Sequence, residues 1–209
     1  MKKQKKAKFI IGVTGSFGSG KSTVAKMLRN FLNASLIDAD KIAHRVLKDS
    51  WIKNRLIDFF GREIVNKNNR IDTQLLGKIA FKNKRNLVSL NKITHPKIIR
   101  TIKNEINRSQ KSIIILDAPL LIESNLYRIV DKIVVVKTDI KKQILRLKKR
   151  GFCADEIKRR IRFQIHLREK LRFADFVIDN NGRLEQTKRQ IRKILGRLKY
   201  GENRKTRYR

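Results

Sequence analysis

The sequence predicts an α/β fold in which helices cover a five-stranded parallel sheet. Short apolar runs rich in β-branched residues alternate with segments of helical periodicity, and a glycine-rich loop follows the first run. Continuous apolar runs are typical of parallel strands buried on both faces. A chain of 209 residues is long enough for one such domain with a small insertion. The expected strands cover residues 9–14, 35–40, 112–117, 132–136 and 176–178.

The first strand is followed by Gly15-Ser16-Phe17-Gly18-Ser19-Gly20-Lys21-Ser22, which fits the P-loop pattern, and residues 23–32 then have helical spacing. The glycines let the backbone approach a phosphate, and successive N–H groups form an anion nest. This context predicts a P-loop NTPase-type three-layer α/β/α fold rather than a glycine-rich turn that binds nothing. We expect Lys21 to contact the phosphates of ATP and Ser22 to ligate Mg²⁺. The expected ATP-binding residues are Gly15, Gly18, Ser19, Gly20, Lys21, Ser22 and Thr23.

The second expected strand ends in Asp38 and Asp40, at the edge where parallel sheets place their ligands. Both acids point the same way if the pleat continues. The alternative is that Asp40 only caps a helix that begins at Lys41. The neighbouring P-loop favours a functional role for both acids.

Residues 41–108 are mostly helical in pattern and are expected to form a substrate-binding insertion. Asp72 or Thr73 is expected to cap one helix. Because proline is tolerated in the first turn of a helix, we place His95 at the start of a long helix through Asn107. His95 and Arg100 are candidates for substrate contacts; the alternatives are a capping or packing histidine and an exposed charge.

The run at residues 112–117 is the clearest strand, and Asp117 at its end is placed like a Walker-B acid that holds Mg²⁺. After the next strand, residues 141–172 carry 13 Lys and Arg against three acids, which indicates a basic helical lid or a solvated basic face. The nucleotide-binding core is then expected at residues 8–40, 109–140 and 173–200. Residues 1–7 and 201–209 are expected to be flexible tails.

The formal charge of +35 comes from 53 basic and 18 acidic residues. These basic residues are spread over the whole chain, so we interpret most of the excess as compositional drift toward AT-rich codons. Nucleic-acid binding and steering of polyanionic substrates are the alternatives. The single cysteine, Cys153, excludes an internal disulfide and suits a reducing cytosol, and the apolar runs are too short for a membrane span.

The chain resembles the dephospho-coenzyme A kinases, which phosphorylate the ribose 3′-hydroxyl of dephospho-coenzyme A. Ser16 and Phe17 depart from that pattern, in which a second glycine and often isoleucine stand at these positions. The resemblance covers most of the chain and rests on Thr14 to Thr23, Ile37-Asp38-Ala39-Asp40, His95-Pro96 with Arg100, Asp117-Ala118-Pro119-Leu120-Leu121, Arg146 with Arg150, Arg160 with Gln164, and Ala174-Asp175 through Ile178-Asp179-Asn180.

The resemblance implies ATP and Mg²⁺ as cofactors, with Lys21 neutralising the phosphates and Ser22 and Asp117 at the metal. Asp40 is implied as the base or orienting group for the hydroxyl, supported by Asp38. The substrate side would be His95 and Arg100, and the lid arginines that close over the phosphoryl group would be Arg146, Arg150 and Arg160.

Two competing hypotheses are a nucleoside monophosphate kinase or other small-molecule P-loop kinase, and a basic nucleic-acid-binding protein switched by ATP. The Asp-Ala-Asp and His-Pro blocks argue against the first, and the sequence contains no recognisable nucleic-acid motif that would support the second. We therefore expect a cytoplasmic enzyme, a monomer or weak homo-oligomer, with no specific nucleic-acid or membrane partner.

Overall fold

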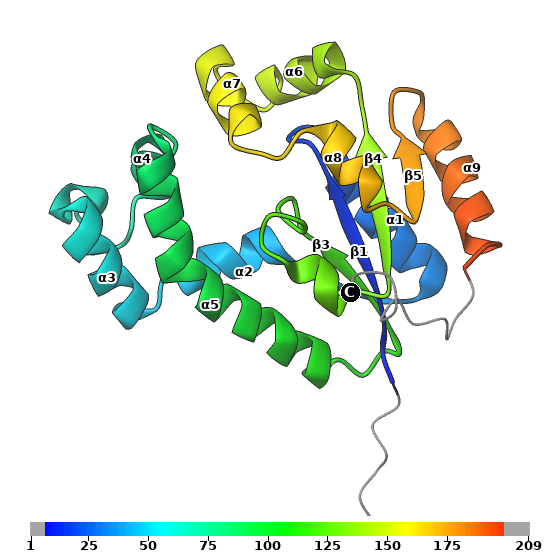
Figure 1. The fold of residues 1–209 in the computed structure, drawn as a ribbon, viewed down its shortest axis with the longest axis horizontal. Coiled ribbons are helices and arrows are strands. Elements are labelled where there is room, and N and C mark those ends of the chain that lie inside the picture. Colours follow the sequence, from blue (N-terminus) through cyan, green and yellow to red (C-terminus); the bar gives the residue numbers. More distant parts are fainter. Residues whose placement is uncertain (1–6, 199–209) are drawn as a thin grey trace, which may run out of the picture.

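The computed structural model describes residues 7–198 and contains the predicted five-stranded parallel sheet (Figure 1). Its strands lie in the order β2-β3-β1-β4-β5. The chain leaves β1 toward β2 on one side and leaves β3 toward β4 on the other, so the carboxyl ends of β1 and β3 flank the switch point where open α/β sheets bind ligands. The strands are β1 (Phe9–Gly15), β2 (Ser35–Asp38), β3 (Ile113–Asp117), β4 (Lys132–Lys137) and β5 (Phe176–Asp179).

Side chains alternate between two hydrophobic clusters, one on each face of the sheet. On one face, Ile11 and Val134 pack with α1 (Lys21–Leu32) and α9 (Leu184–Leu195). On the other, Ile10 and Ile133 pack in a larger cluster that includes residues of α2 (Ala39–Val46) and α5 (Lys84–Arg108). Because both faces are covered, β1, β3 and β4 contain continuous buried apolar runs, and the predicted three-layer α/β/α class is confirmed.

The segment between β2 and β3 is helical, as expected, and contains α2, α3 (Ser50–Phe60), the short 3₁₀ helix η1 (Arg62–Ile64), α4 (Thr73–Ala80) and α5. Asp72 caps α4 by accepting hydrogen bonds from the amides of Gln74 and Leu75, each 2.9 Å long. In Figure 1, α3 and α4 project to one side of the sheet.

Three helices follow β4: α6 (Ile140–Lys148), α7 (Ala154–Arg162) and α8 (Leu167–Arg172). A 3₁₀ turn, η2 (Leu126–Ile129), lies between β3 and β4. Figure 1 shows α6 and α7 beyond the carboxyl ends of the strands, opposite α3 and α4. No helix among residues 7–198 has the length and apolar character needed to cross a bilayer. Apart from Ala7, the expected N-terminal tail lies outside the described residues, as does the C-terminal one.

Two local predictions were wrong. The second strand ends at Asp38, because the Asp38 carboxylate accepts the Lys41 amide at 3.0 Å and starts α2 as its N-cap; Asp40 therefore lies in the first helical turn rather than on a continued pleat. His95 and Pro96 lie in the middle of α5, not at its start. Asn83 caps that helix twelve residues before His95, and packing of Leu90 and Ile98 against the core carries the helix past the amide that Pro96 lacks.

Candidate active site

The P-loop joins β1 to α1 at the centre of the sheet's carboxyl edge. Gly18 and Gly20 have φ angles of 80° and 87°, in the left-handed region that favours glycine. A Cβ at Gly20 would lie 2.2 Å from the Asn180 Nδ2 atom, and one at Gly18 would lie 2.8 Å from the Leu147 side chain. Both glycines are therefore required by conformation and by close packing behind the loop.

A neutral polar network fixes the loop from behind. The Ser19 carbonyl accepts hydrogen bonds from Thr138 Oγ1 at 2.9 Å and from Asn180 Nδ2 at 2.8 Å. Thr187 donates to the Asn180 Oδ1 atom at 2.9 Å, and all four of these residues are buried. Sequence reasoning assigned no role to Thr138, Asn180 or Thr187, although Asn180 ends the Ile178-Asp179-Asn180 block on which the resemblance rests.

Arg146 hydrogen-bonds to carbonyl groups of this network. Its Nη2 donates to the Asn180 carbonyl at 2.8 Å, and its Nη1 lies 3.4 Å from the Ser19 carbonyl. The guanidinium therefore crosses from α6 to the P-loop and to the end of β5. Arg150 lies just beyond α6 and is exposed.

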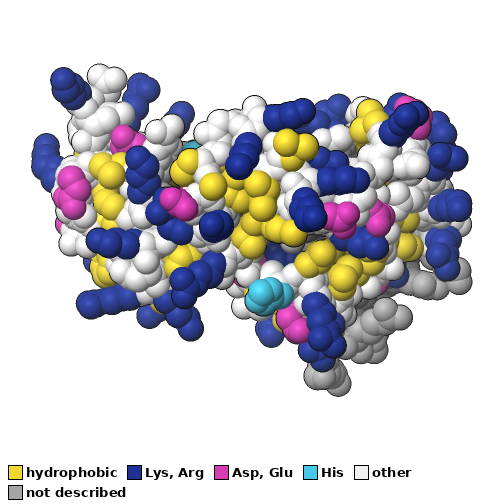
Figure 2. All heavy atoms as spheres, turned by 90° about the horizontal axis from the view of Figure 1, so that it is seen from above, with side chains coloured by type: hydrophobic (Ala, Val, Ile, Leu, Met, Phe, Trp, Pro, Cys, Tyr) yellow, Lys and Arg dark blue, Asp and Glu magenta, His cyan; other side chains and the backbone are white. Residues whose placement is uncertain are grey.

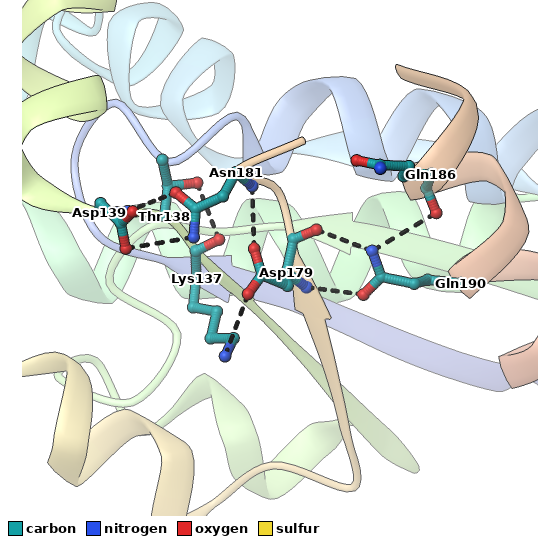
Figure 3. Close-up of polar contacts among 7 residues, drawn as sticks. All are labelled: Lys137, Thr138, Asp139, Asp179, Asn181, Gln186 and Gln190. Atoms are coloured by element: carbon teal, nitrogen blue, oxygen red, sulfur yellow. Dashed lines mark hydrogen bonds and ion pairs between the residues drawn. The ribbon is translucent and has the colours of Figure 1, made fainter. Parts of the chain in front are cut away.

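The ends of β4 and β5 are held together by polar side chains (Figure 3). Asn181 accepts the Asp139 amide at 2.8 Å and donates to the Asp139 carboxylate at 3.2 Å. Asp179 pairs with Lys137 at 3.2 Å, and Gln190 of α9 hydrogen-bonds to both the amide and the carbonyl of Asp179 at 2.8 Å. These contacts place Asn180 under the P-loop.

Acidic side chains converge in front of the loop. Asp117 on β3 stands in register with Val13 on β1 and with Asp38 on β2. Burial raises the pKa of Asp117, while the Lys21 ammonium and a hydrogen bond from Ser22 act in the opposite direction. The structure therefore brings Lys21, Ser22, Asp38 and Asp117 together.

Asp40 belongs to the same group although it lies on a helix. Its side chain keeps solvent access, yet enough protein surrounds the carboxylate for desolvation to raise its pKa. Lys21 opposes that rise most strongly, and His44 and Arg160 oppose it less. A carboxylate with a raised pKa is a stronger base toward the proton of a hydroxyl than one of ordinary pKa.

The residues present fit a magnesium ion. The Asp117 Oδ1 atom is buried and has no hydrogen-bond partner within residues 7–198, and the Ser22 hydroxyl lies at the same carboxylate. Across those residues, no group of three or more His, Cys, Asp or Glu side chains forms a complete metal site. Mg²⁺ typically binds through one or two protein oxygens together with substrate phosphates, which suits this sparse set.

A buried ion pair joins α8 to the segment that follows β3. Lys170 of α8 is fully buried, and its Nζ atom lies 2.9 Å from Glu123 Oε1 and 2.7 Å from the Pro119 carbonyl. Thr14 donates to the same carbonyl at 3.0 Å, and Glu123 accepts the Ile165 amide at 3.1 Å. The pair thus ties the segment after Asp117 to β1 and to the end of the lid, and sequence reasoning missed it.

The remaining candidates, Arg160, His95 and Arg100, lie on α7 and α5. Arg160 on α7 pairs with Glu156 at 2.9 Å and lies among phenylalanine rings. His95 is partly buried, which lowers its pKa, and Arg100 is exposed one turn later on α5. No hydrogen bond joins His95 or Arg100 to the P-loop within the part of the chain that the structure describes.

The family model and the curated relatives point to the same family. The family model for dephospho-CoA kinase (CoaE) matches residues 9–186. The chain is 43% identical over 196 residues to the dephospho-CoA kinase of Carboxydothermus hydrogenoformans, covering 91% of this chain and 95% of that protein.

Two solved structures resemble the fold. The crystal structure of TT1252 from Thermus thermophilus has a TM-score of 0.79 at 30% identity and covers 93% of this chain and all of that one. The dephospho-CoA kinase from Campylobacter jejuni has a TM-score of 0.58 at 28% identity, covering 93% of this chain and 99% of that chain.

Proposed function

Because this chain belongs to the dephospho-CoA kinase family, we infer that it transfers the γ-phosphoryl group of ATP to the ribose 3′-hydroxyl of dephospho-CoA, the last step of coenzyme A synthesis. The observation that carries this inference is the meeting of a P-loop with Asp38, Asp40 and Asp117 at the switch point of the sheet. The loop supplies a site for phosphates, and the acids supply one for a hydroxyl acceptor.

We propose that the amides of the P-loop and the Lys21 ammonium bind the phosphates of ATP, with Gly15, Gly18, Ser19, Gly20 and Thr23 shaping the loop. Ser22 and Asp117 would hold Mg²⁺; when bound, the ion neutralises charge on the β- and γ-phosphates. The Ser19 network fixes the loop in advance, so less reorganisation is needed when charge shifts during transfer.

Asp40 is proposed to orient the 3′-hydroxyl and take its proton. Its raised pKa supports this role, because a carboxylate of ordinary pKa is a weaker base. Asp38, held by the Lys41 amide, would keep the start of α2 in place and support Asp40. The insertion at residues 41–108 would bind the acceptor, with His95 and Arg100 as contacts on α5.

Residues 141–172 are proposed to act as the lid over the core at residues 8–40, 109–140 and 173–200. Arg146 already contacts the Ser19 carbonyl, so it would act from the base of the lid. Arg160 and Arg150 would approach the phosphates from α7 and from the turn that precedes it. We further propose a cytoplasmic monomer or weak homo-oligomer. We propose no specific nucleic-acid partner, since Figure 2 shows Lys and Arg spread over the viewed face rather than gathered in one patch.

A substrate panel tests the function. ADP formation would be measured for the purified chain with dephospho-CoA, with nucleoside monophosphates and with RNA, and the product would be examined by ³¹P NMR for a 3′-phosphate. We expect turnover with dephospho-CoA alone, and Lys21→Ala serves as the matched inactive control. Faster turnover with a nucleoside monophosphate, or ATP hydrolysis that needs RNA, would replace the proposal with the corresponding alternative.

A further inference from the structure

Three aromatic rings surround the guanidinium of Arg160. Its Cζ atom lies 5.2 Å from the centroid of Phe17, 5.2 Å from that of Phe152 and 5.8 Å from that of Phe81. Glu156, one turn earlier on α7, pairs with the Nη2 atom at 2.9 Å. All three distances are within the range in which a cation is attracted to a ring face.

The rings come from three different segments. Phe17 is in the P-loop, Phe81 follows α4 in the insertion, and Phe152 lies between α6 and α7. Phe17 and Phe152 meet edge to face with centroids 5.2 Å apart and planes at 83°. Arg160 is therefore the point at which the P-loop, the insertion and the lid contact one another.

Phe17 is attached to the lid a second time through its backbone. Its amide donates a hydrogen bond of 3.0 Å to the Oε1 atom of Gln164, which follows α7. The ring and the amide of one P-loop residue thus contact lid residues four positions apart. This arrangement fixes both the position of the guanidinium relative to the loop and the course of the chain after α7.

An arginine side chain has considerable rotamer freedom, and its planar guanidinium acts on phosphates only when it is held in the correct orientation. We propose that Phe17 is a positioning residue, whose ring holds the Arg160 guanidinium in register with the phosphate-binding loop. The proposal rests on the proposed function, because it takes the phosphates of ATP to be the groups that Arg160 meets. Arg160 is also near enough to Asp40 for its positive charge to lower the pKa of that carboxylate.

The first test compares kcat and KM for Phe17→Leu and Phe17→Tyr. Leucine keeps the apolar contact but removes the ring, so kcat should fall roughly three- to thirty-fold, the range from an exposed to a desolvated cation–ring contact, with KM for dephospho-CoA little changed. Tyrosine retains the ring and should restore most of kcat. Phe31→Leu is the matched control. The Phe31 ring lies 5.6 Å from the Cζ atom of Arg192, outside the P-loop, so this substitution should leave both constants unchanged.

The second test is a double-mutant cycle with Arg160→Lys, which keeps the positive charge but loses the planar group. If the ring acts through the guanidinium, Phe17→Leu should change kcat less than about twofold in the Arg160→Lys background. Fully additive effects would overturn the proposal, because the ring would then act independently of Arg160.

Three other outcomes would also overturn it: a Phe17→Leu enzyme with wild-type kcat, a change confined to KM for ATP, or a loss of kcat that Phe17→Tyr does not restore. Each would show that the ring serves nucleotide binding or packing. Failure of the proposed function is seen separately, since the wild-type chain would then not phosphorylate dephospho-CoA in any of these assays.

Discussion

Two lysines lie within electrostatic reach of each other at the carboxyl edge of the sheet, and their surroundings are opposite. Lys170 is fully buried, paired with Glu123 and hydrogen-bonded to a carbonyl, and desolvation lowers its pKa. Lys21, at the start of α1, is partly exposed and forms no ion pair with any residue in the described range 7–198.

We interpret the Lys170 charge as structural and propose that the Lys21 charge serves substrate binding. A buried cation needs its partner, because an uncompensated charge in the interior is strongly destabilising. A cation that must bind a substrate is left without such a partner, and the incoming phosphate supplies the counter-charge. The same contrast distinguishes Glu123, which forms an ion pair with Lys170, from Asp117, which forms no ion pair with any residue in the described range 7–198.

Replacing Lys21 should have the largest effect on turnover. Lys21→Ala removes the charge that we propose to contact the phosphates, and kcat/KM should fall by about 10²- to 10³-fold. The free energy of unfolding should stay within about 0.5 kcal/mol of wild type, because no ion pair is lost. Steady-state kinetics and urea denaturation measure the two quantities, and more than a tenth of wild-type turnover would contradict the phosphate role.

Asp40→Asn should lower kcat by roughly 10²-fold, since the amide has similar size but no basicity. Binding of Mg²⁺-ATP, followed by calorimetry, should change little because the loop amides, Lys21 and Ser22 do that work. Weak nucleotide binding with kcat preserved would instead place Asp40 at the metal. No change in either constant would leave Asp40 as an ordinary first-turn residue of α2.

Breaking the buried ion pair between Lys170 and Glu123 should change the free energy of unfolding more than it changes activity. Lys170→Met leaves the Glu123 carboxylate buried and unpaired, so the free energy of unfolding should fall by about 3–5 kcal/mol. Lys170→Met combined with Glu123→Leu removes both charges and should recover most of that stability in denaturant titrations. A double variant that is as unstable as the single one would show that the hydrogen bond to Pro119, rather than the ion pair, holds this region.

The smallest expected effect is on the pH dependence of kcat/KM. Because burial raises the pKa of Asp40, the acid limb of the kcat/KM profile should lie above the ordinary aspartate value of 3.8, and activity should be lost as pH falls through the raised pKa. His44 lowers that pKa, so His44→Ala should move the limb to higher pH. The exposed His166 is the control, and an equal shift in His166→Ala would assign the change to something other than contact with Asp40.

Local patterns were sufficient for the parts of the fold that depend on nearby residues. The five strands and the cap at Asp72 follow from runs and spacings that tertiary packing did not alter. Asp40 and His95 were misplaced within their elements because Asp38 and Asn83, rather than the residues expected, start the two helices. In each case the position of one helix cap decided the outcome.

The missed residues depend on contacts between distant parts of the chain. In the sequence, β4, α6 and α7 lie between Glu123 and Lys170, and the residues next to either one do not indicate that the two form a pair. The phenylalanines around Arg160 come from segments that local periodicity treats separately. The proximity of Asp38 and Asp117, by contrast, was predictable because parallel strands bring their carboxyl ends to one edge.

The carbonyl of Ser19 has a consequence for synthesis of the chain. Two of its hydrogen-bond donors, Thr138 and Asn180, follow it by 119 and 161 residues. A growing polypeptide that has emerged only through β3 therefore holds the complete P-loop sequence without the groups that shape it. Since loop closure must precede such distant contacts, we expect the nucleotide site to be the first motif translated and among the last structures completed.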